Sequence, residues 1–161
     1  VANRALQQLP GDSRLLYSRA MLHEQLDNLS GLEADLRRIL ADDPQNAMAM
    51  NALGYTLADR NLRLEEALEL IEQALALAPE DPAIIDSLGW VHFRLGNLEL
   101  AEELLRRAYA AFPDQEVAAH LGEVLWMLGK RREAREVWDA ALRNDPDSPQ
   151  VRETRQRLEQ R

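Results

Sequence analysis

Cysteine is absent from the 161 residues, and no apolar run approaches the roughly 20 residues that a helix needs to span a bilayer. Without cysteine the chain has no thiolate metal ligand, no cysteine nucleophile and no thiol redox chemistry. The sequence also lacks a His-x3-His ligand pair, a phosphate-cradling glycine loop and a serine nucleophile elbow. These absences predict a protein that is not an enzyme, with no catalytic residue, no metal and no cofactor.

Basic charge is scarce over most of the chain. The formal net charge is −9, and residues 1–129 hold 10 basic and 21 acidic residues, whereas residues 130–161 hold 9 and 7. Because nucleic-acid binding needs a basic stripe, we expect no nucleic-acid partner. The acidic part can steer cationic protein segments towards it, or it can simply keep a long exposed surface in solution.

What the sequence does contain is a repeat. A Leu-Gly pair precedes an alanine, a large apolar residue, a second alanine and a proline, and the last four follow one another at fixed spacing. Three copies end at Pro79, Pro113 and Pro146, and a weaker copy with Leu32, Leu36 and Ile39 ends at Pro44. This order, with a period of about 34 residues, is the pattern of the tetratricopeptide repeat (TPR), a pair of antiparallel helices, A and B, that stacks on its neighbours.

The repeat predicts an all-α fold, a TPR solenoid of stacked antiparallel helix pairs wound into a right-handed superhelix. We expect one array over residues 1–161, with four repeats at 13–46, 47–81, 82–114 and 115–148. Residues 149–161 are expected to form a polar capping helix at which the array ends. Residues 1–10 look like the end of a truncated repeat, so we expect further repeats upstream.

Local signals place the helix ends and the close contacts. Cap residues are expected at Asp12, Asn46, Asp81 and Ser148, and a capping box at Ser30–Glu33. Glycine inside a helix costs about 1 kcal/mol relative to alanine, so mid-helix glycines indicate a close approach of helix B. These glycines are Gly54, Gly89 and Gly122, and the facing alanines are Ala67, Ala101 and Ala134. Trp138 takes the large apolar place in helix B and is expected in the core.

The inward faces of helices A predict the binding surface. In TPR arrays, the second, fifth, ninth, twelfth and thirteenth residues of helix A line a solvent-exposed groove. Aromatic residues and methionines gather at these positions, and such side chains carry binding energy and adapt to a partner. Packing against the next helix A is the alternative role for the aromatic residues. We predict a protein-binding groove lined by Tyr17, Met21, Met48, Asn51, Tyr55, Asp86, Trp90, Phe93, Glu123, Trp126 and Met127.

Four stretches resemble one bacterial group of TPR proteins. Residues 51–60, 86–90, 94–96 and 118–126 are similar to the C-terminal repeats of TPR lipoproteins of the Gram-negative envelope, of the LbcA type. The resemblance implies an adaptor on the periplasmic face of the outer membrane that holds a carboxy-terminal processing protease and presents peptidoglycan hydrolases to it. It also implies an N-terminal lipid anchor outside residues 1–161 as the membrane attachment.

Two other functions remain open at this point. The chain can be a TPR assembly factor with another client, in the periplasm or the cytoplasm, or a structural scaffold that associates with its own copies. A chaperone cofactor that reads acidic C-termini is disfavoured, because its two-carboxylate clamp needs lysines and asparagines in the groove and only Asn51 fits.

Overall fold

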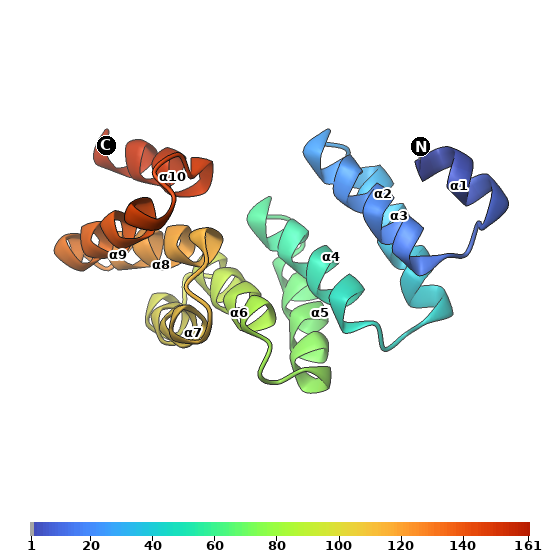
Figure 1. Ribbon diagram of the computed structural model, residues 1–161. Coiled ribbons are helices and arrows are strands. Elements are labelled where there is room, and N and C mark those ends of the chain that lie inside the picture. Colours follow the sequence, from blue (N-terminus) through green and yellow to red (C-terminus); the bar gives the residue numbers. More distant parts are fainter. Residues whose placement is uncertain (1) are drawn as a thin grey trace. The chain divides into compact units, whose positions relative to one another are not determined.

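The computed structural model describes residues 2–161, and every regular element in that range is a helix (Figure 1). From α2 to α9, helices A of 13 residues alternate with helices B of 14 residues. The predicted all-α fold of paired helices is therefore confirmed. The helices are α1 (Ala2–Gln8), α2 (Ser13–Gln25), α3 (Leu29–Asp42), α4 (Ala47–Asp59), α5 (Leu64–Leu77), α6 (Pro82–Arg94), α7 (Leu98–Ala111), α8 (Gln115–Met127), α9 (Arg131–Asn144) and α10 (Pro149–Glu159).

The chain forms two compact units, residues 1–78 and 79–161. Unit 1 contains α1 and the pairs α2–α3 and α4–α5, and unit 2 contains the pairs α6–α7 and α8–α9 followed by α10. Within each unit, helix B packs on its own helix A and on the helix A that follows it, α3 on α4 and α7 on α8. The prediction of one continuous array stays a prediction.

A polar side chain caps the start of every helix A. Asp12, Asn46, Asp81, Asp114 and Ser148 each accept a hydrogen bond from a backbone N–H in the first turn that has no partner inside the helix. The expected capping box at Ser30–Glu33 is wrong, because α3 begins one residue before Ser30. Asn28 is its cap and accepts from the Gly31 N–H at 3.0 Å, and Glu33 instead binds arginines.

Each helix A of the four repeats ends in the same left-handed turn. The residue after the C-cap has a positive φ at Asp27 (55°), Asn61 (56°), Gly96 (88°) and Gly129 (81°). The next N–H returns to the carbonyl five residues earlier, as from Leu62 to Leu57 at 2.9 Å, which is the bond of a Schellman motif. Glycine fits this conformation without cost, whereas a residue with a Cβ is strained there.

Replacing Asn61 by glycine is therefore expected to stabilise unit 1 by about 0.5–1 kcal/mol. Asn61→Ala should destabilise it by about 1 kcal/mol, because alanine lacks the polar side chain that makes asparagine tolerant of this conformation. Urea unfolding followed by circular dichroism gives both values. Equal stability of the glycine and alanine variants would contradict the role given to the turn.

The second repeat has one extra residue between its helices, and Arg63 accommodates it. Arg63 precedes α5 with φ 43° and donates from its guanidinium to both carboxylate oxygens of Glu33, at 2.7 and 3.0 Å. This bond is the main reason that the pKa of the Glu33 carboxyl lies below its usual value, and Arg37 adds to the effect. The longer turn thus places the Arg63 guanidinium of the second repeat against the Glu33 carboxylate of the first, and this ion pair connects the two repeats of unit 1.

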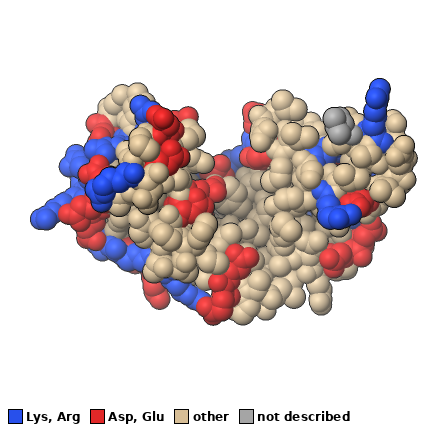
Figure 2. Space-filling model, in the orientation of Figure 1, with Lys and Arg blue, Asp and Glu red and all other residues tan. Residues whose placement is uncertain are grey.

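Unit 2 has a charge cluster of the same kind. Glu102 on α7 binds Lys130 and Arg106, and Arg106 also binds Glu133 of the next repeat at 2.6 Å. Acidic and basic side chains are interspersed over the face drawn in Figure 2, and basic side chains gather over the α9–α10 end. These surface pairs help set repeat spacing within a unit and are individually weak contributors to stability.

Mid-helix glycines let helices A and B touch. A Cβ built on Gly54 would lie 2.7 Å from Ile71, one on Gly89 2.7 Å from Leu105, and one on Gly122 1.9 Å from Trp138. The facing alanines, Ala67, Ala101 and Ala134, are fully buried, and so is Trp138. The close approach predicted from the glycine and alanine spacing is therefore confirmed, as is the core position of Trp138.

Candidate protein-binding surface

In unit 1 the predicted surface residues lie on α2 and α4. Met48 is 59% exposed, while Tyr17, Met21, Asn51 and Tyr55 are half-buried. Burial raises the pKa of the Tyr17 phenol above its usual value. Each of these five helix positions is reachable by a partner at least in part.

Tyr17 and Met48 share one hollow of about 220 Å³ between α2 and α4. Ile39 of α3, Ser13, Arg14, Ser18 and Asn46 complete its lining. The repeat pattern did not identify Ile39 as part of this surface. Its signal in the sequence is its size: Ile39 stands where the other three repeats have the second alanine, Ala74, Ala108 or Ala141.

In unit 2 the inner residues of α6 are covered by α8. The His120 Nδ1–H donates to both Asp86 oxygens, at 2.9 and 3.0 Å, and the His120 ring stacks on Trp90 with ring centres 4.0 Å apart. Asp86, Trp90 and His120 are all at most 6% exposed. The sequence pattern did not single out His120 as the partner of this acid and this indole.

The stack continues outward from Trp90 to the surface of α6. Phe93 lies against Trp90 with ring centres 4.8 Å apart, and the Arg94 guanidinium lies 4.9 Å from the Trp90 ring centre, a cation–π distance. Phe93 remains partly exposed. It is therefore the member of this stack that a partner can reach.

On α8, the predicted surface residue Glu123 is held by α10. Arg157 donates to both Glu123 carboxylate oxygens, at 2.9 and 2.7 Å, and leaves Glu123 only 7% exposed. Val151 and Leu158, the apolar residues of α10, are buried in the same contact region of unit 2. Helix α10 thus covers the Glu123 position of the fourth repeat.

Trp126 packs over α9 and Met127 faces solvent. The Trp126 ring centre lies 5.8 Å from that of Trp138, and the guanidinium groups of Arg131 and Arg135 lie 4.9 and 5.2 Å from the Trp126 ring centre. Met127 is 52% exposed. Trp126 presents only part of its ring, and Met127 presents most of its side chain.

The expectation that all eleven residues are solvent-exposed is therefore wrong for Asp86, Trp90 and Glu123. His120 of α8 covers Asp86 and Trp90, and Arg157 of α10 covers Glu123. These three residues therefore pack against the following helix and do not line an open surface. The residues that stay partly or largely exposed are Tyr17, Met21, Met48, Asn51 and Tyr55 in unit 1, and Phe93, Trp126 and Met127 in unit 2.

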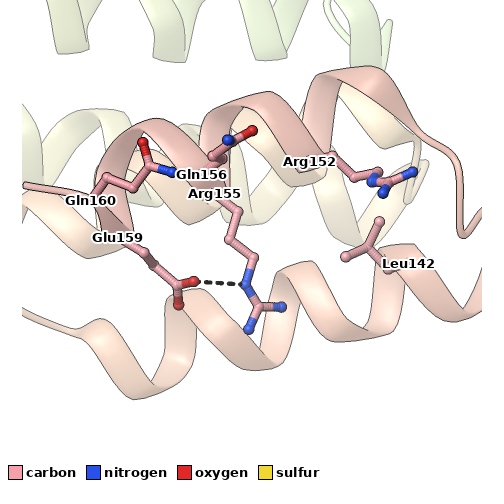
Figure 3. A pocket seen from close by; sticks show the side chains of 6 residues that line it. All are labelled: Leu142, Arg152, Arg155, Gln156, Glu159 and Gln160. Carbon is pink, nitrogen blue, oxygen red and sulfur yellow. Dashed lines mark hydrogen bonds and ion pairs between the residues drawn. The ribbon is translucent and has the colours of Figure 1, made fainter.

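A second hollow, of about 430 Å³, lies along α10 (Figure 3). Leu142 of α9 and the α10 residues Arg152, Arg155, Gln156 and Glu159 line it. Its arginines are already paired, Arg152 with Asp147 and Arg155 with Asp139 and Glu159. Arg155-Gln156 stands where α4, α6 and α8 have Leu-Gly, so α10 lacks the apolar and small side chains that receive a helix B in those three repeats.

Within residues 2–161 no group of three or more histidine, aspartate or glutamate side chains is placed to hold a metal ion. Nor does any helix in that range have the length and apolar character needed to cross a membrane. What the helices A present is a set of exposed methionine and aromatic side chains suited to contact with another protein.

Comparison with known proteins agrees with the helix pattern. Family models described as tetratricopeptide repeat match residues 33–82, 60–116 and 92–158. The TPR repeat-containing protein PA4667 of Pseudomonas aeruginosa is 57% identical over 118 residues, which is 73% of this chain and 20% of that protein. Bacteriophage adsorption protein A of Escherichia coli is 33% identical over 89 residues, 55% of this chain and 9% of that protein. The chain thus spans a fifth or less of the length of these relatives.

A solved structure shares the fold over almost the whole chain. The thermophilic TPR protein TTC0263 of Thermus thermophilus superposes with a TM-score of 0.85 at 23% sequence identity, covering 98% of this chain and 86% of that one. The family models, which together span residues 33–158, establish the family. The chain belongs to the tetratricopeptide repeat family.

Proposed function

We propose that this chain is a non-enzymatic adaptor segment that binds protein partners on the helix-A surfaces of its two units. The TPR fold supports a role as a protein–protein interaction scaffold. The observation that carries the proposal is the exposure of Met48 and Met127 on helices A, each in a unit that also presents partly exposed aromatic side chains. Flexible methionines beside rigid aromatic rings suit a surface that has to fit a partner segment.

The more specific assignment is an adaptor on the periplasmic face of the outer membrane of a Gram-negative bacterium. Its partners would be a carboxy-terminal processing protease and the peptidoglycan hydrolases that the protease degrades. The support is the resemblance of residues 51–60, 86–90, 94–96 and 118–126 to envelope lipoproteins of the LbcA type. The 57% identity to a Pseudomonas TPR protein is compatible with such an origin.

Affinity capture from a Pseudomonas aeruginosa envelope extract, read by mass spectrometry, tests this assignment. We expect the parent chain to enrich a carboxy-terminal processing protease or peptidoglycan hydrolases. Capture of an unrelated client instead would favour an assembly factor, and capture of the chain's own copies alone would favour a self-associating scaffold. Either outcome would overturn the adaptor assignment.

A matched pair of phenylalanines tests the surface. Phe93→Ala should weaken binding of a captured partner by about tenfold or more, the loss expected for a binding hot spot. Phe112→Ala is the control, because Phe112 is 58% exposed but is the C-cap residue of α7, a helix B, and does not occupy one of the helix-A positions. Circular dichroism has to show that both variants keep their helices. Equal affinity of the two variants would contradict a helix-A binding surface in unit 2.

A further inference from the structure

We propose that the hollow between α2 and α4 binds one large apolar side chain that stands next to a carboxylate in a segment of a partner protein. The proposal rests on the proposed function, which it makes more specific for unit 1. It assigns to Tyr17, Met48 and Arg14 the recognition of two adjacent groups of the partner.

Three side chains make up the apolar part of the lining. Ile39 is 2% exposed, the Tyr17 ring is half-buried, and the flexible side chain of Met48 is 59% exposed. A volume of about 220 Å³ falls below the roughly 300–1,000 Å³ of pockets that enclose whole small molecules. The hollow therefore suits a single side chain of a longer segment better than it suits a small-molecule ligand.

The polar part of the lining carries hydrogen-bond donors. The Tyr17 hydroxyl has no hydrogen-bond partner among residues 2–161, and burial is what raises its pKa, so it stays protonated and able to donate. The Asn46 side-chain oxygen is used by the Ala49 N–H, which leaves its amide N–H groups for a ligand. The Ser18 hydroxyl adds a third group that can donate.

The charge of the lining residues favours a ligand with an anionic group. No carboxylate lines the hollow, although unit 1 as a whole carries more acidic than basic residues. The lining residue Arg14 has a side chain that is 90% exposed and makes a single 3.3 Å contact with Asp12. The remaining guanidinium N–H groups are available for a carboxylate of a partner, in the geometry that arginine favours.

A peptide segment is the occupant that fits both features. Its apolar side chain would pack against Ile39, Tyr17 and Met48. A neighbouring aspartate, glutamate or C-terminal carboxylate would bind the Arg14 guanidinium. Its backbone carbonyls meet the donors of Asn46 and Ser18. A purely aliphatic ligand would leave the hydrogen-bond donors of the lining without acceptors. A ligand with only a carboxylate would leave the apolar side chains of the lining exposed to water.

Three acylated amino acids test the apolar contact and the carboxylate contact independently. The chain, labelled with ¹³C at its methionine methyl groups, is titrated with N-acetylphenylalaninate, with N-acetylphenylalanine amide and with N-acetylalaninate. The Met48 methyl signal should move saturably with the first probe, and the amide should bind about tenfold more weakly, because it replaces a charge-assisted hydrogen bond by a neutral one. The alaninate should cause no saturable shift. The Met127 signal in unit 2 serves as the internal reference.

Point variants then assign each part to its residue. Arg14→Gln should make the affinities for N-acetylphenylalaninate and its amide equal, whereas Asp12→Asn keeps a capping side chain and should favour the anion further by removing a competing carboxylate. Tyr17→Ala should abolish the Met48 shift. Leu26→Gln is the control, because Leu26 is 76% exposed in the same unit and does not line the hollow.

Two results would overturn the proposal. One is the absence of a saturable Met48 shift with N-acetylphenylalaninate at the highest soluble concentration. The other is equal affinity of the parent for the acid and the amide. If a partner is still captured from envelope extract and that capture still depends on Phe93, the scaffold function stands and only the assignment of this hollow fails.

Discussion

Gly122→Ala is expected to destabilise unit 2 by about 3 kcal/mol, at the upper end of what overpacking a core costs. The added methyl carbon would lie 1.9 Å from Nε1 and 2.4 Å from Cε2 of the Trp138 indole. Trp138 is fully buried among residues of α8, α9 and α10, so its rigid ring has no free space to move into. Chemical unfolding followed by circular dichroism measures the loss.

The same substitution at other glycines provides a graded comparison. At Gly89 the methyl group would meet the Leu105 side chain at 2.7 Å. At Gly54 it would meet the Ile71 side chain at 2.7 Å and the Ala67 carbonyl oxygen at 3.0 Å. Both aliphatic side chains are more flexible than an indole. At Gly11 the nearest atom is 3.9 Å away, so Gly11→Ala is the control. We expect the cost to fall from Gly122 to Gly89 and Gly54, and to nearly vanish at Gly11.

Making Gly122→Ala in a Trp138→Leu chain tests whether the indole causes the loss of stability. Trp138→Leu gives the fourth repeat the same residue that Leu105 supplies in the third. In that background Gly122→Ala should cost about as much as Gly89→Ala does in the parent chain. If Gly122→Ala is as costly with leucine as with tryptophan, the helix backbone and not the indole sets the limit, and the contact assigned here is wrong.

The repeat register could be predicted from the sequence because its causes are local. The glycine of helix A, the alanines of helix B and the cap residues Asp12, Asn46, Asp81 and Ser148 all act within one repeat or its adjoining turn. Their spacing alone located the close contacts and the starts of helices A. The Asn28 cap was missed because the Ser30–Glu33 spacing fits a capping box equally well, and only the actual start of α3 decides between them.

Exposure of the surface residues could not be predicted in the same way, because it depends on the next helix A. Trp90 and Glu123 occupy the same repeat position as Tyr55, which is half-buried. They are buried because His120 stacks on Trp90 and Arg157 binds Glu123. A periodic pattern identifies the face on which a residue lies, but the chemistry of the neighbouring repeat decides whether that face is covered.

Removing His120 is expected to be the second most damaging change, with a loss of about 3 kcal/mol for His120→Ala. The substitution leaves the buried Asp86 carboxylate without the imidazole that binds both of its oxygens, and an uncompensated buried charge costs several kcal/mol. It also removes the ring stacked on Trp90 at 4.0 Å. Chemical unfolding gives the free energy, and Trp90 fluorescence reports the loss of the stack.

Substitution of both partners shows whether the loss comes from the stranded carboxylate. The double variant Asp86→Leu/His120→Leu leaves no buried polar group unpaired, so it should cost less than His120→Ala alone, as found for buried pairs replaced by apolar residues. Asp86→Asn keeps an acceptor for the His120 N–H and should cost less than about 1.5 kcal/mol. A double variant that is as unstable as the sum of its single substitutions would mean that Asp86 and His120 are not coupled. The pair would then only fill space between α6 and α8, and the burial of Trp90 would need another cause.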